Sequence, residues 1–195
     1  MPEHVPDSLK LRRLFRAALE QAFTEYVSLY SPSVAEHLSE GVLVEFVHMD
    51  KVYRLRDAAG QRLERIPEML QTSAQPEGPE RRMEVDRYIG DFALFMVGFF
   101  PSSLRSVEMQ AADPMISRVG KLLVQFSRPV DYYIAEGRNA YRRAADTARL
   151  FDPQARDTFT RLSDGFDGYR DVMGRVKRIL SDTPQVQELD ASLDL

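Results

Sequence analysis

Residues 88–100 (YIGDFALFMVGFF) are the most apolar stretch of the chain. A helix with this sequence is apolar on nearly every side, so neighbouring elements must bury it. The stretch is thirteen residues long and contains Asp91, whereas a helix that spans a membrane needs about 20 apolar residues. We therefore expect a helix over residues 80–100 at the centre of a globular domain, and no membrane insertion.

The rest of the chain also has helical periodicity, and no segment is convincing as a strand. Apolar residues recur about every 3.6 positions, and the Asp-Pro pairs at 113–114 and 152–153 are typical helix starts. Residues 42–47 have a strand-like composition, but the helical stripe continues on both sides of them. Besides 80–100, the predicted helices cover residues 8–30, 34–55, 62–72, 114–127, 129–150 and 153–181.

These patterns predict a single all-α domain, a bundle of six or seven helices around the central apolar helix. The helical domain is expected to cover residues 1–181. Residues 182–195 contain acidic side chains and no basic one, so we expect an acidic, disordered C-terminal tail there.

Composition excludes several classes of function. The chain has no cysteine, which rules out a thiolate metal site, an iron–sulfur cluster or a cysteine nucleophile within it. Its net charge of -4 is unlike that of a dedicated nucleic-acid binder. Residues 1–7 lack the basic and apolar regions of a secretory signal, which favours a cytoplasmic location. The phosphate-binding loops and the nucleophile elbow of known enzyme classes do not occur.

The position of Asp91 inside the apolar stretch has two interpretations. On a helical wheel Asp91 shares a narrow stripe with Arg87, four residues earlier, and Glu84. In the first interpretation this stripe is the one polar edge of the helix, and Arg87 forms an ion pair with Asp91. In the second, Asp91 points inward, loses its hydration and serves a functional site.

Two glycines in the same helix, Gly90 and Gly98, indicate that other helices approach it closely. The predicted helix 129–150 is a suitable neighbour, because its apolar face carries mostly small residues with Tyr133 and Tyr141 one turn either side of a glycine. Tight packing between these helices is the first interpretation. The alternative is a ligand pocket lined by Tyr88, Tyr133 and Tyr141.

Glu45 and His48 form a Glu-x-x-His unit on the predicted helix 34–55. Carboxylate-bridged metal sites in helical bundles use this spacing, because side chains three residues apart project together into the bundle. Such sites need two units, and this chain has one. A metal bound by Glu45, His48 and Asp91 is therefore the alternative to a structural salt bridge or hydrogen bond at Glu45.

Arginines gather on the polar side of the predicted helix 129–150, among them Arg138 and Arg142. A solvated helix face is the first interpretation of this cluster. The alternative is an anion-binding site, or a docking surface for an acidic partner.

Two hypotheses about function remain. The first is a non-enzymatic protein-interaction or regulatory module that binds a protein partner or self-associates as a homodimer, and needs no cofactor. The second is a small-molecule- or metal-binding helical bundle, a class that includes oxidoreductases. The missing catalytic and cofactor motifs favour the first hypothesis.

Overall fold

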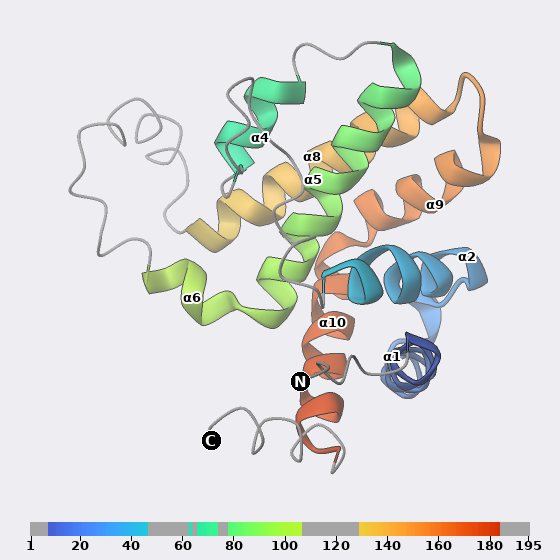
Figure 1. Cartoon of the computed structure of the whole chain (residues 1–195), viewed down its shortest axis with the longest axis vertical. Coiled ribbons are helices and arrows are strands. Elements are labelled where there is room, and N and C mark those ends of the chain that lie inside the picture. The colour runs from blue at the N-terminus through green and yellow to red at the C-terminus, as the bar shows by residue number, and fades with distance from the viewer. Residues whose placement is uncertain (1–7, 47–62, 64–65, 74–77, 107–128, 184–195) are drawn as a thin grey trace, which may run out of the picture.

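The computed structural model describes residues 8–46, 63, 66–73, 78–106 and 129–183. The helix α5 (Pro79–Phe99) lies at the centre of this part of the protein (Figure 1). All regular elements in these ranges are helices, so the all-α prediction is confirmed. Among the described helices, none combines the length and the apolar character that crossing a bilayer requires.

The elements follow one another along the chain in a simple order. They are α1 (Ser8–Phe23), the 3-10 turn η1 (Val27–Leu29), α2 (Pro32–Glu36), the π-helix η2 (His37–Val44), α4 (Ile66–Ser73), α5, α6 (Pro101–Ser106), α8 (Pro129–Ala148), α9 (Pro153–Asp164) and α10 (Phe166–Ser181).

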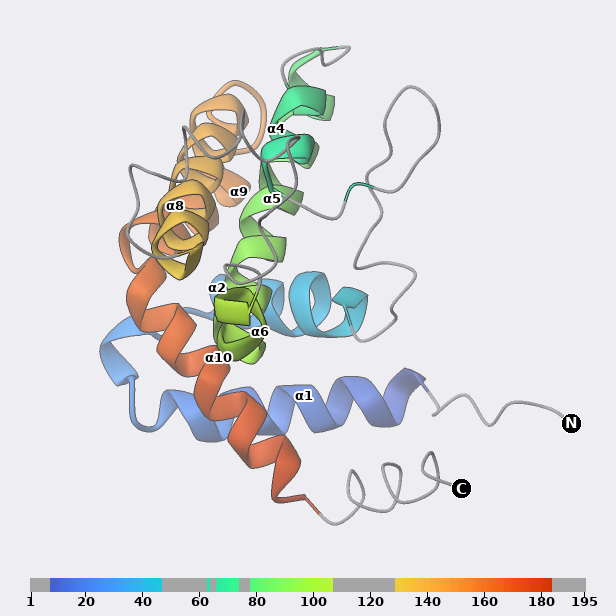
Figure 2. The ribbon, with the colours of Figure 1, turned by 90° about the vertical axis from the view of Figure 1, so that its left-hand side faces the viewer.

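The helix α5 is buried from Val85 to Val97 with few interruptions, as its all-round apolar sequence predicts. Its most extensive partner is α8, which runs antiparallel to it and covers one side. On its other sides α5 contacts α10, η2 and α4. Figure 2 shows α1 crossing α10 below α5 and α8. The central position of the apolar helix is confirmed.

Proline begins many of these helices. It occupies the first position of α2, α5, α6, α8 and α9, where its missing N–H costs no hydrogen bond and its fixed φ suits the helix. The predicted cap at Asp152 is confirmed, since its side chain accepts a hydrogen bond of 2.9 Å from the backbone N–H of Ala155.

The structure corrects two predicted helix boundaries. In both cases packing against other helices determines where the helix ends. The helix predicted over 8–30 ends at Phe23, and the chain turns so that Leu29 packs against Gly168 and accepts a hydrogen bond from Tyr169. The helix predicted over 153–181 breaks at Gly165 into α9, which covers α8, and α10, which packs on α5 and α1. A side chain at Gly165 would meet the ring of Tyr169 at 2.9 Å.

Four other predictions are met in part or fall beyond the described ranges. The helix predicted over 34–55 is helical through residue 46, but it contains the π-helix η2 around Gly41, and its later residues lie outside the described residues. The helix predicted over 62–72 is described as α4 from Ile66. The helix predicted over 114–127 and the predicted tail, apart from Asp182 and Thr183, also lie outside the described residues.

Candidate functional site

The carboxylate of Asp91 lies in the core of the bundle, with its side chain only 1% exposed. It accepts hydrogen bonds from His37 Nε2 at 2.6 Å and from Tyr141 Oη at 2.7 Å, both at Oδ1. Arg87 Nη1 donates to Oδ2 at 2.9 Å. We call these four residues the Asp91 cluster. The predicted ion pair with Arg87 is therefore present, and Asp91 also points inward, so each interpretation of Asp91 was right in part.

Two glycines make room for the rings of this cluster. A Cβ at Gly90 would lie 2.7 Å from the ring of Tyr141, so only glycine lets α8 bring this tyrosine against α5. A Cβ at Gly41 would lie 3.3 Å from the His37 ring on the same helical segment. The predicted neighbourhood of α5 and the helix 129–150 is confirmed, and Tyr141 is the tyrosine that reaches Asp91.

The three donors keep Asp91 ionised despite its burial. Burial by itself raises the pKa of Asp91, but the charges and hydrogen bonds of His37, Arg87 and Tyr141 more than offset this, and the pKa is lowered. Burial and the nearby carboxylate together raise the pKa of Tyr141 well above its ordinary value. Tyr141 is therefore a neutral hydrogen-bond donor at neutral pH.

The imidazole of His37 connects the Asp91 cluster to the protein surface. An ionised carboxylate only accepts hydrogen bonds, so Nε2 of His37 carries a proton. In the neutral ring Nδ1 is then an acceptor, and no side chain among the described residues donates to it. The side chain of His37 is 12% exposed, and it lines a surface cavity.

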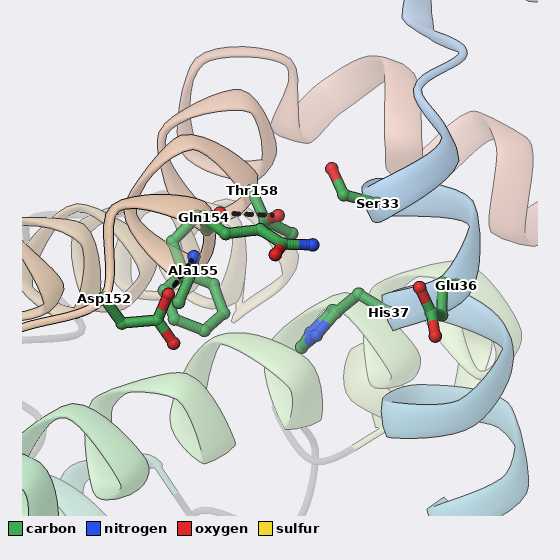
Figure 3. A pocket seen from close by; sticks show the side chains of 8 residues that line it. Ser33, Glu36, His37, Asp152, Gln154, Ala155 and Thr158 are labelled. Carbon is green, nitrogen blue, oxygen red and sulfur yellow. Dashed lines mark hydrogen bonds between the residues drawn. The ribbon is translucent and has the colours of Figure 1, made fainter.

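This cavity has a volume of about 260 Å³ and lies between α2 and the start of α9 (Figure 3). Ser33, Glu36 and His37 line one side of it, and the other side comes from the first residues of α9 and its cap. These other lining residues are Asp152, Gln154, Ala155, Thr158 and Phe159. The lining is polar and contains two carboxylates, while Phe159 packs edge-on against the His37 ring with centroids 5.6 Å apart.

Large apolar side chains are exposed in the two links that border this cavity. Val27 (72% exposed) and Tyr30 (50%) lie just before α2, and Leu150 (71%) and Phe151 (41%) lie just before α9. Phe151 is adjacent in the chain to Asp152, which lines the cavity, so Leu150 and Phe151 lie beside it, since consecutive Cα atoms are about 3.8 Å apart. The links before α2 and before α9 both lie on the right in Figure 1.

A second buried carboxylate lies on α5, one turn before the Asp91 cluster. Asp86 is 3% exposed and accepts a hydrogen bond of 2.8 Å from Arg143 Nε on α8. Burial raises the pKa of Asp86, and the charges of Arg143 and Arg82 offset the increase only partly. Asp86 and Asp91 therefore have opposite pKa shifts, because Asp91 has three donors and Asp86 has one.

The other predicted ligand-binding residues lie apart from the cavity. Tyr88 and Tyr133 both pack against Phe92, with ring centroids 6.5 and 6.3 Å away. Arg138 on α8 forms an ion pair with Asp167 at the start of α10, and Arg142 is exposed. These residues do not line the cavity at His37.

The predicted metal ligands are described only in part. His48 lies outside the described residues, and Glu45, which is half-buried, interacts electrostatically with Arg87. Within the described ranges there is no group of three histidine or acidic side chains that could hold a metal ion. The set of Glu45, His48 and Asp91 stays a prediction.

Sequence reasoning missed His37 as a functional candidate. The sequence offers one signal, the glycine four residues after it, which leaves space for a ring on the same helical face. It offers no signal that pairs His37 with Asp91, which is 54 residues away.

Comparisons of this chain with models of protein families, with curated proteins and with solved structures find no match. The arrangement of its own side chains is therefore the basis for any functional proposal.

Proposed function

We propose that the protein is a non-enzymatic interaction module that binds a protein partner at one end of the helical bundle. We call this surface the recognition end and define it by Val27, Tyr30, Leu150, Phe151 and the cavity at His37. Exposed apolar side chains with polar groups at their rim are typical of protein-binding surfaces. The proposal is carried by the exposure of these four residues in the two links that lead into α2 and α9, the helices that line the cavity.

The distribution of exposed apolar residues supports this choice of surface. In the described part of the chain five large apolar side chains are exposed, and four of them belong to the recognition end. The fifth, Phe100, has the ammonium group of Lys177 5.4 Å from its ring centroid, which partly covers it. Apolar exposure is therefore concentrated at one end instead of being scattered over the surface.

The Asp91 cluster has a structural role in this proposal. Three donors saturate the buried carboxylate, and two of them come from elements other than α5. The cluster therefore fixes η2 and α8 on α5 and holds His37 at the floor of the cavity. A satisfied network of this kind gives the recognition end one defined shape.

One observation favours a second candidate function, the binding of a small molecule. Glu36, Asp152 and Gln154 place acceptor oxygens in the lining of the cavity, beside the ring of His37. A ligand rich in hydrogen-bond donors suits this lining. Native mass spectrometry of the protein as purified separates the two candidates, because a bound small molecule adds a defined mass to the monomer.

Site-specific photo-crosslinking in living cells tests the interaction proposal. A photoreactive amino acid such as benzoylphenylalanine is placed at Leu150 or at Val27, and at Asp131 as the control. All three positions are exposed, and Asp131 lies in the first turn of α8, at the opposite end of that helix from Leu150. We expect light-dependent adducts of defined protein mass from positions 150 and 27 but not from position 131.

Adducts at equal frequency from all three positions would indicate unspecific surface contacts and would contradict the proposal. The absence of adducts at 150 and 27, with normal expression of the labelled chain, would contradict it as well. Mass spectrometry of each adduct shows whether the attached chain is a different protein or another copy of this one.

A further inference from the structure

We propose that the recognition end binds a second copy of this chain, with Arg149 of each copy entering the other copy's cavity beside Glu36 and Asp152. This inference rests on the proposed function, because it names the partner of the same surface. It depends on three features of the recognition end, namely an arginine and a pair of carboxylates that form no ion pair among the described residues, and exposed apolar residues next to the arginine in the chain.

The first feature is a cation without a partner at the edge of the recognition end. Arg149 directly follows α8, and its side chain is exposed. Its backbone N–H donates to Ala145, but within the described ranges its guanidinium forms no ion pair or hydrogen bond. Arg156, on α9, behaves differently, since it pairs with Asp157.

The second feature is a pair of carboxylates in the cavity that no cation neutralises among the described residues. Glu36 is exposed and lines the cavity, and it has no ion-pair partner there. Asp152 uses Oδ1 to cap α9 through Ala155 and forms no ion pair in the same ranges. Figure 3 shows the two carboxylates at opposite sides of the cavity, with His37 and Gln154 between them.

Charge complementarity within one surface makes a second copy the fitting partner. In a twofold dimer the same patch of both subunits meets itself, so a contact from residue i to residue j occurs twice. Arg149 and the two carboxylates lie in that patch, and among the described residues none of them forms an ion pair within one chain. A twofold arrangement pairs both arginines with the acidic cavities opposite them.

The apolar residues of the recognition end are placed to support such a dimer. Leu150 and Phe151 follow Arg149 directly, and Val27 lies in the link that precedes α2. An arginine that enters the partner's cavity brings these side chains against the partner surface. Burial of Leu150 and Val27, each more than 70% exposed in the single chain, then supplies hydrophobic stabilisation that the ion pairs alone do not.

Sedimentation velocity of charge-reversed variants of the full chain tests the proposal. The variants are Arg149→Glu, Glu36→Arg and the double variant that carries both changes. Arg142→Glu is the matched control, because Arg142 is an exposed arginine on α8, two turns before Arg149. Circular dichroism and thermal melting establish that every variant keeps the fold of the unchanged chain.

We expect the unchanged chain and Arg142→Glu to dimerise alike. Each single reversal at 149 or 36 places like charges together at both contacts of the dimer, so it weakens dimerisation at least about tenfold. The double variant regains the dimer. An equal mixture of Arg149→Glu with Glu36→Arg regains it too, as a complex of one copy of each.

Three results overturn the inference. They are a chain that stays monomeric at every concentration tested, single reversals that dimerise like the unchanged chain, and a mixture that does not associate although its components are folded. If photo-crosslinking from Leu150 nevertheless captures a different protein, the proposed function stands and only the identity of the partner is wrong. If the crosslinks also fail, both proposals fail.

Discussion

At the scale of single residues, Asp91 determines how the centre of the bundle is held together. Its carboxylate is 1% exposed and receives hydrogen bonds from His37, Arg87 and Tyr141. A buried ion pair adds little net stability when compared with apolar residues of the same shape, because burial removes the hydration of both charges. Removing one partner is costly, since the other charge then stays buried without compensation.

We therefore expect Asp91→Asn to lower the free energy of unfolding by about 3 kcal/mol. The asparagine side chain lacks the negative charge. Its NH2 group is a donor, so it faces one of the donors of the cluster without forming a hydrogen bond to it. Arg87→Met should also lower the free energy of unfolding. The double variant should lose less than the sum of the two single losses, because the Arg87–Asp91 interaction is lost only once. Urea denaturation followed by circular dichroism measures all three variants. Strict additivity would show that Arg87 and Asp91 are not coupled.

The pH dependence of the same variant follows from the lowered pKa of Asp91. A carboxylate whose folded-state pKa lies below its unfolded value of about 3.9 stabilises the native state above that pH. This contribution is lost as the pH falls through the folded-state pKa. The stability difference between the unchanged chain and Asp91→Asn should stay constant from neutral pH to about 4 and shrink below it. Denaturation at a series of pH values measures the difference.

Asp86 provides the control for that experiment, because its pKa is raised by burial. A raised pKa means that the native state binds the proton more tightly than the unfolded chain does. The unchanged chain should therefore gain stability relative to Asp86→Asn as the pH falls from the folded-state pKa toward about 3.9. If the stability differences for Asp91→Asn and Asp86→Asn changed in the same direction as the pH falls, the opposite pKa shifts assigned to these two carboxylates would be wrong.

At the scale of helical elements, glycines set how closely α5, α8 and α10 approach one another. A Cβ at Gly90 would meet the Tyr141 ring at 2.7 Å, and one at Gly98 would meet Met173 Cβ at 2.5 Å. Gly174, on α10, is different, because the nearest atom to its Cβ would be the carbonyl oxygen of Gly98 at 3.7 Å. Some glycines are thus required by packing, while Gly174 leaves room for a methyl group.

Alanine at these positions should have opposite effects. Alanine favours a helix over glycine by roughly 0.5–1 kcal/mol, so Gly174→Ala should stabilise the protein by about that amount. At Gly90 the same gain is outweighed, because the methyl group forces Tyr141 away from Asp91, and Gly90→Ala should destabilise by about 2 kcal/mol. Thermal and urea denaturation of both variants measure the contrast. Similar effects at both positions would contradict the close approach of α5 and α8.

The elements that local sequence controls could be predicted, and those that packing controls could not. The apolar pattern of α5 and the Asp152-Pro153 start of α9 are local signals, and the structure confirms both. The break at Gly165 depends on Phe166, which fills the space beside Gly137 on α8. A contact of that kind involves residues far apart in sequence, and helical periodicity does not contain it.

At the scale of the whole molecule, the candidate site is made by the packing of distant segments. The sequence identified Asp91 and Tyr141 separately, but His37 joins them only because η2 crosses α5 near Gly41 and Gly90. The recognition end likewise combines the link before α2 with the link before α9. Periodicity identifies the face that each helix buries, but the order of helices in space depends on which faces fit together.

The two kinds of charge in this arrangement should respond differently to salt. An increase in ionic strength from about 0.1 M to about 1 M shortens the Debye length from about 10 Å to about 3 Å. The exposed side chains of Arg149 and Glu36, which join the two copies in the proposed dimer, are then screened. The Asp91 cluster is screened much less, because its carboxylate is buried.

We therefore expect salt to weaken association of the copies by at least about tenfold, while the free energy of unfolding of the monomer changes far less. Sedimentation velocity and urea denaturation across the same salt series measure the two quantities. The variant Arg149→Glu should instead associate better as the salt concentration rises, because salt screens the repulsion between the introduced carboxylate and Glu36 of the other copy. If association were insensitive to salt while Arg149→Glu still abolished it, Arg149 would act through apolar contact of its side chain instead of its charge.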